Sequence, residues 1–262
     1  MLFVTWNVNS LRARLPRVLE LLATHQPDVV ALQETKCSTE SFPRTELEQR
    51  GYTVLAHSGG RWSGVALLVR EPLSVQAPAT GLPGDPAPEE ARWCEATVGS
   101  TRFVSVYVPN GRALDSPEFE RKLAFMDAAA KRAAAIRSDT GADRLVIGGD
   151  INVAPTDRDL RDPLAHAGAT HVSDAERGAL AAILARGSLV DAYRHLHPDE
   201  EQFTWWDYRS GNFHKNIGMR IDLALVDGEL ARGLMACGID RNFRKGYKPS
   251  DHAPLLVWLG VG

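Results

Sequence analysis

The sequence is short of cysteine and of long apolar runs, and each shortage excludes a class of protein. Its 262 residues include three cysteines, Cys37, Cys94 and Cys237, with no CxxC spacing. Such a pattern is typical of reduced thiols in the cytoplasm rather than of a disulfide framework. No apolar run approaches the ~18 residues of a membrane-spanning helix, and MLFVTWNVNS at the start does not read as a signal peptide. We therefore expect a cytoplasmic protein that makes no use of a membrane.

An excess of charge and the common nucleophile and nucleotide motifs are also missing. Thirty Lys and Arg stand against 33 Asp and Glu, a formal net charge of −3. Any surface that binds a polyanion must therefore be local. The chain has no G-x-S-x-G motif, catalytic cysteine motif, P-loop or dinucleotide-binding glycine motif. Covalent catalysis by a serine or cysteine is therefore not indicated.

Short apolar runs rich in β-branched residues predict strands at 2–6, 29–33, 64–69, 103–108, 144–149, 221–226 and 253–259. Helices are predicted at 16–25, 117–137 and 173–186, the last opened by the capping-box sequence SDAE. Residues 77–90 are rich in turn formers and predict a surface loop. The strands are too many for one simple parallel sheet. We expect residues 1–262 to form a single domain of two packed sheets covered by helices.

Polar side chains stand where these apolar runs begin or end. They are Asn7 and Asn9, Glu34, Tyr107 and Asn110, Asp150 and Asn152, Asp222, and Asp251 with His252. Strand ends that gather at one rim of a layered α/β fold are where sites are built. Singly, each residue has a structural explanation, such as a turn or cap, a core tyrosine or an ion pair of Asp222 with Arg220. Together they are better explained by a site.

The chemistry of this set favours metal-assisted hydrolysis. Carboxylate and amide oxygens are hard ligands that suit Mg²⁺ or Mn²⁺ better than zinc. A histidine beside an aspartate, and a further aspartate able to take a proton from water, complete the inventory for cleaving a phosphodiester. In that reaction water attacks in line and a cation neutralises the developing charge.

Seven blocks of the sequence resemble a known family. They are WNVNSLRAR (6–14), PDVVALQETK (27–36), YVPNG (107–111), GGDINVAPTD (148–157), FTWWDYRS (203–210), RIDLALV (220–226) and PSDHAP (249–254). In content and order they are similar to the signature blocks of exonuclease III-type abasic-site (AP) endonucleases, in the endonuclease/exonuclease/phosphatase superfamily that includes deoxyribonuclease I. The resemblance implies an α/β fold, a four-layer sandwich of two packed mixed β-sheets flanked by helices.

The same resemblance implies an activity and its cofactor. The implied enzyme is a DNA-repair nuclease that uses Mg²⁺, with Mn²⁺ as an alternative, to cleave 5′ to abasic sites. Exonuclease action in the 3′–5′ direction and cleaning of blocked 3′ ends are implied as well. Glu34 is the implied principal metal ligand, and the full metal set is Asn7, Glu34, Asp150, Asn152, Asp251 and His252.

Catalytic roles follow from the resemblance residue by residue. Asp150 is implied to position and deprotonate the attacking water, and Asn152 to bind the phosphate or the transition state. His252, oriented by Asp222, is implied to hold a phosphate oxygen. Tyr107 is implied to contact the scissile phosphate or to stabilise the leaving group.

The implied partner is double-stranded DNA with an abasic site or a blocked 3′ end, bound by a monomer. The implied DNA contacts are Asn9, Arg12, Lys36, Arg112, His171, Phe203, Trp205, Trp206, Met219 and Arg220. Of these, the large apolar side chains would wall a pocket for a flipped-out abasic sugar. The basic ones would contact phosphates, which positions a duplex without reading its sequence.

Two positions depart from the family pattern. Some relatives have Asp where this chain has Asn9, so one carboxylate near the metal is absent. His171 stands where several relatives have a small residue beside the sugar pocket. One hypothesis is that His171 narrows the pocket and favours trimming of blocked 3′ ends over incision at internal abasic sites; the alternative is an exposed loop histidine.

Two other functions remain open. The same hydrolytic chemistry could act on a phospholipid, an inositol phosphate or RNA, although the WWDYRS block favours DNA. A catalytically dead DNA-binding module is a third interpretation, and the intact set of strand-end carboxylates argues against it.

Overall fold

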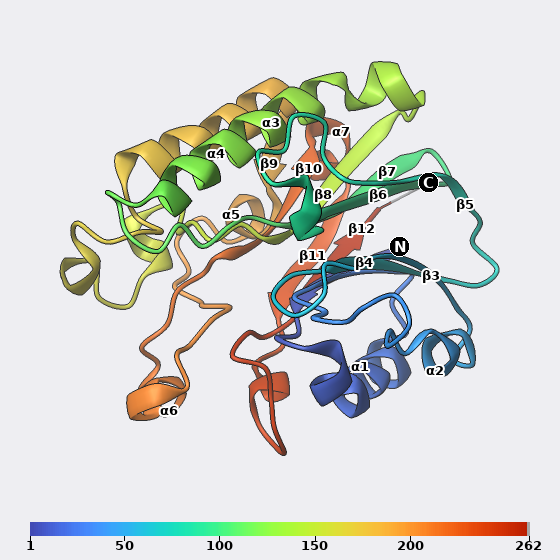
Figure 1. The fold of residues 1–262 in the computed structure, drawn as a ribbon, viewed down its shortest axis with the longest axis horizontal. Helices are drawn as coiled ribbons and strands as arrows, with labels where there is room; N and C mark the ends of the chain where they lie inside the picture. Colours follow the sequence, from blue (N-terminus) through green and yellow to red (C-terminus); the bar gives the residue numbers. More distant parts are fainter. Residues whose placement is uncertain (261–262) are drawn as a thin grey trace.

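The computed structural model describes residues 1–260, in which two mixed six-stranded sheets pack face to face with helices on their outer faces (Figure 1). The strand order is β11-β12-β1-β2-β4-β3 in the first sheet and β5-β6-β7-β8-β10-β9 in the second. The prediction of a four-layer α/β sandwich is confirmed. The strands of the first sheet are β1 Leu2–Asn7, β2 Val29–Gln33, β3 Tyr52–His57, β4 Val65–Arg70, β11 Leu234–Ile239 and β12 Leu255–Leu259. Those of the second are β5 Val75–Thr80, β6 Trp93–Val98, β7 Thr101–Tyr107, β8 Arg144–Asp150, β9 Leu189–Asp191 and β10 Asp222–Asp227.

Each sheet contains one parallel pair, β1 with β2 and β7 with β8, and its other pairs are antiparallel. A parallel pair needs a long crossover, which a helix usually supplies. Here α1 (Leu11–His25) joins the first pair and α3 (Pro117–Thr140) joins the second. The remaining α-helices are α2 Arg44–Glu48, α4 Asp174–Gly187, α5 Ala192–Leu196, α6 Asn212–Lys215 and α7 Gly228–Arg232. Since the two parallel pairs run side by side through the sandwich, their ends reach a common rim.

The main core lies between the sheets. The rings of Phe3 on β1 and Phe103 on β7 meet there with centroids 5.6 Å apart. A Cβ added to Gly148 on β8 would lie 2.4 Å from Cζ of Phe3, so this strand position must be glycine. On the outer faces, α1 and α2 cover the first sheet and α3 and α4 cover the second. Because both faces of each central strand are covered, strands such as β1 are buried along their whole length.

The helices follow the sequence signals closely. The helix predicted at 173–186 is α4, and Ser173 and Glu176 form the reciprocal capping box. The helix predicted at 117–137 is α3, which extends to Thr140. The helix predicted from Pro16 instead begins at Leu11, so Pro16 lies inside α1 and not in its first turn. No helix within residues 1–260 combines the length and the apolar character that crossing a membrane requires.

The predicted loop at 77–90 is wrong at its start, because β5 occupies Val75–Thr80. This strand lies at an edge of the second sheet and is mostly exposed, and its pairing with β6 has a register shift. An exposed edge strand has no buried face and can contain a proline such as Pro78. It therefore lacks the apolar pattern from which strands were predicted; β3, β6, β9 and β11 were not predicted either.

Candidate active site

The ends of strands from both sheets meet at one rim. In the second sheet, the pairing register places Tyr107 of β7 and Asp222 of β10 on either side of Asp150, the last residue of β8. In the first sheet, Asn7 ends β1 and Glu34 directly follows β2. The amide of Asn7 joins the two sheets, because its Nδ2 donates to Asp150 Oδ2 (2.9 Å) and to Glu34 Oε1 (2.7 Å). The structure thus brings together five side chains that are far apart in the sequence.

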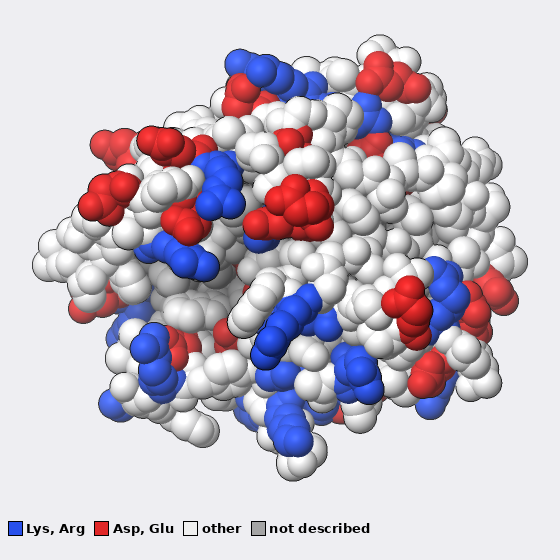
Figure 2. All heavy atoms as spheres, in the orientation of Figure 1, with Lys and Arg blue, Asp and Glu red and all other residues white. Residues whose placement is uncertain are grey.

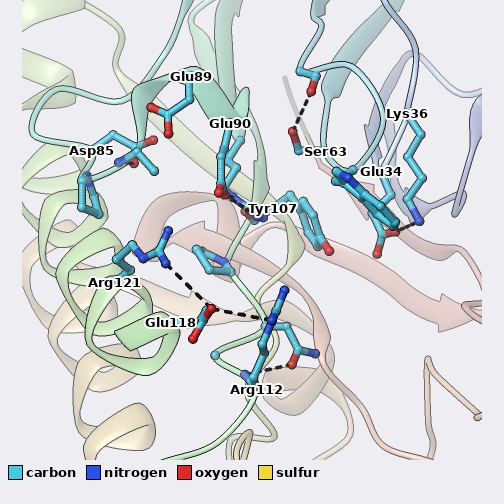
Figure 3. A pocket seen from close by; sticks show the side chains of 18 residues that line it. Glu34, Lys36, Ser63, Asp85, Glu89, Glu90, Tyr107, Arg112, Glu118 and Arg121 are labelled. Carbon is cyan, nitrogen blue, oxygen red and sulfur yellow. Dashed lines mark hydrogen bonds and ion pairs between the residues drawn. The ribbon is translucent and has the colours of Figure 1, made fainter. Parts of the chain in front are cut away.

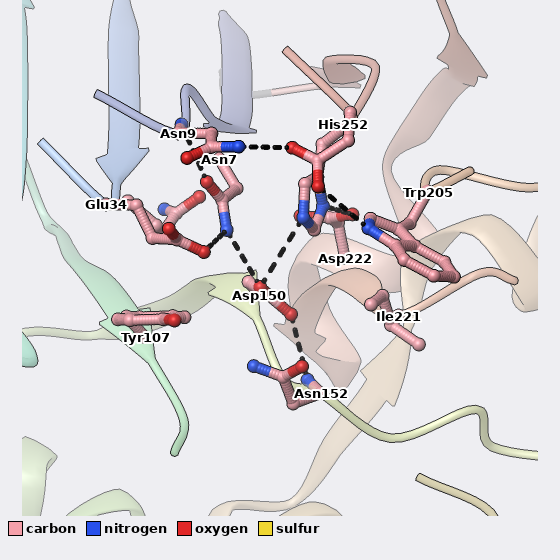
Figure 4. Close-up of polar contacts among 12 residues, drawn as sticks. Asn7, Asn9, Glu34, Tyr107, Asp150, Asn152, Trp205, Ile221, Asp222 and His252 are labelled. Atoms are coloured by element: carbon pink, nitrogen blue, oxygen red, sulfur yellow. Dashed lines mark hydrogen bonds and ion pairs between the residues drawn. The ribbon is translucent and has the colours of Figure 1, made fainter. Parts of the chain in front are cut away.

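A candidate metal centre lies in the middle of this rim (Figure 4). Glu34, Asp150 and His252 each offer a ligand atom, and these atoms all lie within 4.8 Å of one another. The two carboxylates are hard oxygen donors, which suit a divalent cation such as Mg²⁺ or Mn²⁺; the amide nitrogen of Asn7, and not its oxygen, faces them. Lys36 balances part of the negative charge, since its Nζ lies 2.6 Å from Glu34 Oε2. The residues present therefore fit a bound metal.

His252 is held by Asp222. Its Nδ1 lies 2.8 Å from Asp222 Oδ2, and its Nε2 lies 3.9 Å from Asp150 Oδ2. Burial by itself would lower the pKa of His252, but the carboxylates of Asp222, Asp150 and Asp251 raise it above its ordinary value. The imidazole is thus held as a cation with Nε2–H directed into the site, where it can donate to an anionic oxygen.

Asp150 has the opposite charge balance. Burial raises the pKa of Asp150 above its ordinary value; the His252 cation acts against this rise, while Asp222 and Glu34 add to it. A carboxyl group whose pKa is moved towards neutrality is well matched to accept a proton from water. Its Oδ1 accepts from the backbone N–H of Asn152 (3.0 Å), which fixes the plane of the carboxylate.

Asn152 and Tyr107 complete the wall on the side of the second sheet. Asn152 has a positive φ of 54° and donates from Nδ2 to Val108 O (2.9 Å). Tyr107 lies near Glu34, and burial and the charges of Glu34 and Asp150 raise the pKa of Tyr107. The phenol therefore keeps its proton and can donate to a developing oxyanion.

The structure does not bring Asp251 into the group of three candidate ligands. Asp251 Oδ1 accepts from Asn9 Nδ2 (2.9 Å), and Oδ2 accepts from the indole N–H of Trp205 (3.1 Å). Asn9 Oδ1 in turn accepts from Lys36 Nζ (2.7 Å). Asp251 and Asn9 thus form a hydrogen-bonded chain beside the cluster that links Trp205 to Lys36.

The apolar residues predicted to wall the sugar pocket form two separate groups. The backbone of Trp205 forms isolated antiparallel β-bridges with Met219 and with His252. The side chains of Trp205 and Met219 pack with Leu160 next to the site. Phe203 and Trp206 are completely or almost completely buried in a separate apolar cluster. A direct contact of Phe203 and Trp206 with DNA is therefore excluded in this conformation.

The basic residues also divide. Arg12 is exposed, Arg112 is 77% exposed and ion-paired with Glu118 (3.6 Å), and Lys36 is half-buried against the site. Arg220 has no exposed surface, so the prediction that it contacts DNA does not hold. The proposed ion pair of Arg220 with Asp222 does not form either, because Arg220 pairs with aspartates on other segments.

His171 is not the exposed loop histidine of the alternative interpretation. Its side chain is buried, its φ is +79°, and its Nε2 accepts from Asn110 Nδ2 (3.2 Å). Burial and the neighbouring Lys122 hold the pKa of His171 below its ordinary value, so the imidazole is neutral. Its Nδ1 is buried without a hydrogen-bond partner.

A cavity of ≈ 610 Å³ opens beside Glu34 and Tyr107 (Figure 3). Its far wall carries acidic side chains, Asp85, Glu89, Glu90 and Glu118, together with Arg92 and Arg121. Arg92 stacks on the ring of Tyr107 with its Cζ 4.6 Å from the ring centroid. The cavity is therefore continuous with the candidate site and carries charges of both signs.

Lys122 was not among the predicted site residues, and Glu176 was predicted only as part of a helix cap. Both side chains are completely buried and form an ion pair behind the loops of the site. A signal for Lys122 was present, because it lies at helical spacing between Phe119 and Phe125 and hence on the apolar face of α3. A lysine at such a position requires a buried partner.

The two-sheet sandwich and the rim of carboxylates, amides and one imidazolium define a metal-dependent phosphohydrolase. The family model of the Endonuclease/Exonuclease/phosphatase family matches residues 4–252. The chain belongs to this family, which is metal-dependent.

Similar proteins narrow the class further. The exodeoxyribonuclease III of Haemophilus influenzae is 32% identical over 97% of this chain and 98% of its own length. The 3′ phosphatase NExo from Neisseria, bound to a product DNA hairpin, matches with a TM-score of 0.94 and 36% identity over 99% of both chains. An AP endonuclease from Archaeoglobus fulgidus matches with a TM-score of 0.93 and 30% identity over the whole of both chains. The predicted resemblance to the exonuclease III type is confirmed.

Proposed function

We propose that residues 1–262 act as a single-domain, monomeric, cytoplasmic DNA-repair nuclease. With Mg²⁺, or Mn²⁺ as an alternative, it hydrolyses phosphodiester bonds 5′ to abasic sites and processes 3′ ends as an exonuclease and phosphatase. The observation that carries this proposal is the joint placement of Glu34, Asp150 and His252 within 4.8 Å at the shared rim of the two sheets. The similarity to an exodeoxyribonuclease III and to a 3′ phosphatase supports the DNA substrate.

In this proposal Glu34 and Asp150 hold the cation, with Asn7 fixing the distance between them. A bound cation supplies neutralisation of charge at the phosphate. Asn152 and Asp251 lie beside this centre, and Asp251 acts by orienting Asn9. His252 is proposed to act on the phosphate more than on the metal, because Asp222 holds its Nδ1 at 2.8 Å and the surrounding carboxylates raise its pKa.

In this proposal the side chains of the site have separate catalytic roles. Asp150 orients the water and accepts its proton at the carboxylate. Nε2–H of His252, held by Asp222, donates to a non-bridging phosphate oxygen, and the Asn152 amide contacts the same phosphate. Tyr107 O–H donates to the leaving oxygen. Preorganised donors of this kind need no reorganisation as negative charge develops.

DNA is proposed to lie across the hollow face of the rim. Figure 2 shows basic and acidic side chains interspersed on one face of the molecule, without a continuous basic surface. Arg12, Lys36 and Arg112 are proposed to contact phosphates, and Trp205 and Met219 to flank the abasic sugar. Because few phosphates are neutralised, affinity should fall with salt less steeply than for a strongly basic DNA-binding protein.

The proposal is tested with a duplex that carries one abasic site and a second duplex with a 3′-phosphate. We expect a nick 5′ to the abasic site and release of phosphate in Mg²⁺, and neither product in chelator. Glu34→Gln serves as the control for a contaminating nuclease. Metal-dependent hydrolysis of a phospholipid or inositol phosphate, with both DNA duplexes left intact, would contradict the proposed substrate.

We further propose that His171 favours 3′-end processing over internal incision. Its imidazole is fixed by Asn110 and occupies space that a smaller side chain would leave open. Since φ is positive at this position, His171→Gly relieves backbone strain and should not impair folding. We expect the ratio of abasic incision to 3′-phosphate removal to rise at least about tenfold, as access to a sugar pocket changes transition-state binding. The matched control is His166→Gly in the same loop; an unchanged ratio in His171→Gly would reject the role.

A further inference from the structure

Lys122 of α3 lies behind the site, and every N–H of its ammonium group has a hydrogen-bond partner. Its Nζ donates to the backbone carbonyls of Asn152 (2.7 Å) and Asn110 (3.2 Å) and forms an ion pair with Glu176. A lysine ammonium has three N–H donors. Each of the three therefore has one partner, and the two carbonyls belong to loops that border the candidate active site.

Glu176 of α4 extends the same arrangement to a third loop. Its Oε1 accepts from the backbone N–H of His171 (2.8 Å) and from Thr170 Oγ1 (2.9 Å), besides the ion pair with Lys122. Its Oε2 accepts from Ser173 N (3.1 Å) and Ser173 Oγ (2.6 Å). One buried ion pair thus binds three loop segments: the one after β7, and the first and the last part of the long connection from β8 to α4.

Each of the three loops contains a residue with a strained backbone. Arg112, Asn152 and His171 have φ values of 53°, 54° and 79°. A side chain with positive φ is unfavourable, and such a conformation persists only where the surroundings impose it. Gly111 leaves the space that the Lys122 side chain occupies, because a Cβ added at Gly111 would lie 2.9 Å from Lys122 Cδ.

We infer that Lys122 and Glu176 are positioning residues that hold the three strained loops, and with them Asn152 and His171, in the geometry that the active site requires. Stability by itself is a poor reason for this pair, because buried ion pairs are often no more stabilising than apolar side chains of similar volume. The hydrogen bonds to loop backbone provide a reason that apolar packing cannot replace. The expected loss of nuclease activity rests on the proposed function. The expected loosening of the loops rests on the geometry alone.

The test uses the paired variant Lys122→Met with Glu176→Gln, which removes the buried charges together and so avoids leaving one unpaired. The matched control is Arg102→Met with Glu95→Gln, which removes another buried ion pair, joined at 2.8 Å. Arg102 precedes Tyr107 by five residues on β7, about 16 Å along an extended strand. Both double variants remove a buried ion pair, and the control also removes the ion pair of Glu95 with Arg132, but only the first frees the loops.

For the Lys122/Glu176 variant we expect kcat on the abasic and the 3′-phosphate duplex to fall about 10- to 100-fold, since a misplacement near 1 Å has an effect of this size. KM should change less than about threefold, and Tm should remain near that of the control variant. A folded variant with wild-type kcat would overturn the inference, and so would an equal loss of kcat in the control. Inactivity of the wild type on both duplexes would instead contradict the proposed function.

A second measurement does not depend on activity. Backbone amides in 110–112, 152–154 and 170–172 should exchange with solvent at least about tenfold faster in the Lys122/Glu176 variant, because these loops then open locally. The control variant should leave their exchange unchanged. Unaltered exchange in the Lys122/Glu176 variant would reject the positioning role even if the DNA substrate proved wrong.

Discussion

Two buried clusters of charge lie on either side of the start of β10, and they differ in how their charges are balanced. One contains Arg220, two residues before Asp222. Arg220 Nε lies 2.7 Å from Asp159 Oδ1, and Arg220 Nη1 lies 2.7 Å from Asp191 Oδ2. Burial by itself would raise the pKa of Asp159, but Arg220 lowers it below its ordinary value. Arg194 Nη2 also lies 2.7 Å from Asp159 Oδ1, so two guanidinium cations face the two acids and the charges of this cluster are balanced.

The other cluster is the candidate active site, and its acids outnumber its cations. The carboxylates of Glu34, Asp150 and Asp222 face one imidazole, with Lys36 at the edge. Here burial raises the pKa of Asp150, and the neighbouring acids add to this rise. The comparison shows that equally buried aspartates can have opposite effects. With enough neighbouring cations they stabilise the fold, and with too few they leave negative charge that a bound cation can neutralise. The balance of neighbours decides between the two.

The largest effect is expected when the unbalanced cluster loses its proposed base. Asp150→Asn keeps the shape of the side chain but cannot accept a proton. We expect kcat for abasic incision to fall about 10²- to 10⁴-fold, the usual contribution of general base catalysis, while binding of the duplex is retained. Single-turnover kinetics and a binding titration measure the two separately. A residual rate within about tenfold of wild type would show that another group takes the proton.

A substitution in the balanced cluster around Arg220 should lower the free energy of unfolding and leave the rate of DNA cleavage unchanged. Arg220→Met leaves Asp159 and Asp191 buried without their main cation, which typically destabilises a protein by about 3–5 kcal/mol. Urea unfolding measures this loss, and Arg209→Met, which removes an exposed ion pair, is the control with an expected change within about 0.5 kcal/mol. A stability equal to wild type for Arg220→Met would contradict the assigned structural role.

Metal binding should satisfy the unbalanced cluster. At a Mg²⁺ concentration about 100 times the dissociation constant, a single site stabilises the folded state by about 2.7 kcal/mol. We expect Tm to rise accordingly in wild type, and the rise to be mostly lost in Glu34→Gln. Differential scanning calorimetry with Mg²⁺, Mn²⁺ and chelator measures the effect. An equal rise in both proteins would place the ion elsewhere.

The smallest effect concerns the metal-free protein and its dependence on pH. Because the folded protein raises the pKa of Asp150 above its unfolded value, ionised Asp150 destabilises the fold at pH values above the folded pKa. This cost decreases as pH falls and disappears below the unfolded pKa, where the group is protonated in both states. In chelator, Asp150→Asn should therefore unfold at a higher temperature than wild type at pH 8, because the variant does not bury this charge. The difference should vanish near pH 4; a difference independent of pH would contradict this origin.

Much of the fold and of the site could be predicted because the relevant signals are local. The apolar runs predicted seven strands, among them β1, β2, β8 and β10, but not the buried strand β6. The capping box at Ser173 predicted the start of α4. Strand ends carrying Glu34, Asp150 and His252 predicted a metal site because few structural explanations cover all of them at once. The exposed strand β5 escaped because an edge strand has no buried face to leave a pattern.

Burial of polar groups could not be predicted in the same way. Arg220 was expected at the surface, and His171 was open to the same interpretation, yet both are buried. Lys122 was overlooked because a lysine inside a helical pattern is usually exposed. In each case the partner that makes burial tolerable lies far along the chain, such as Glu176 for Lys122.

By itself, the sequence determined which residues could do chemistry and where the strongly apolar strands and the long helices lie, because residue type and periodicity act within a few positions. Only the tertiary structure decided which acids are neutralised and which are left in excess. Asp150 and Asp159 are nine residues apart, and the sequence does not distinguish their environments. Packing places one beside other carboxylates and the other beside Arg220. The interaction energy of buried charges depends on distance in space, and this distance is set by the whole fold.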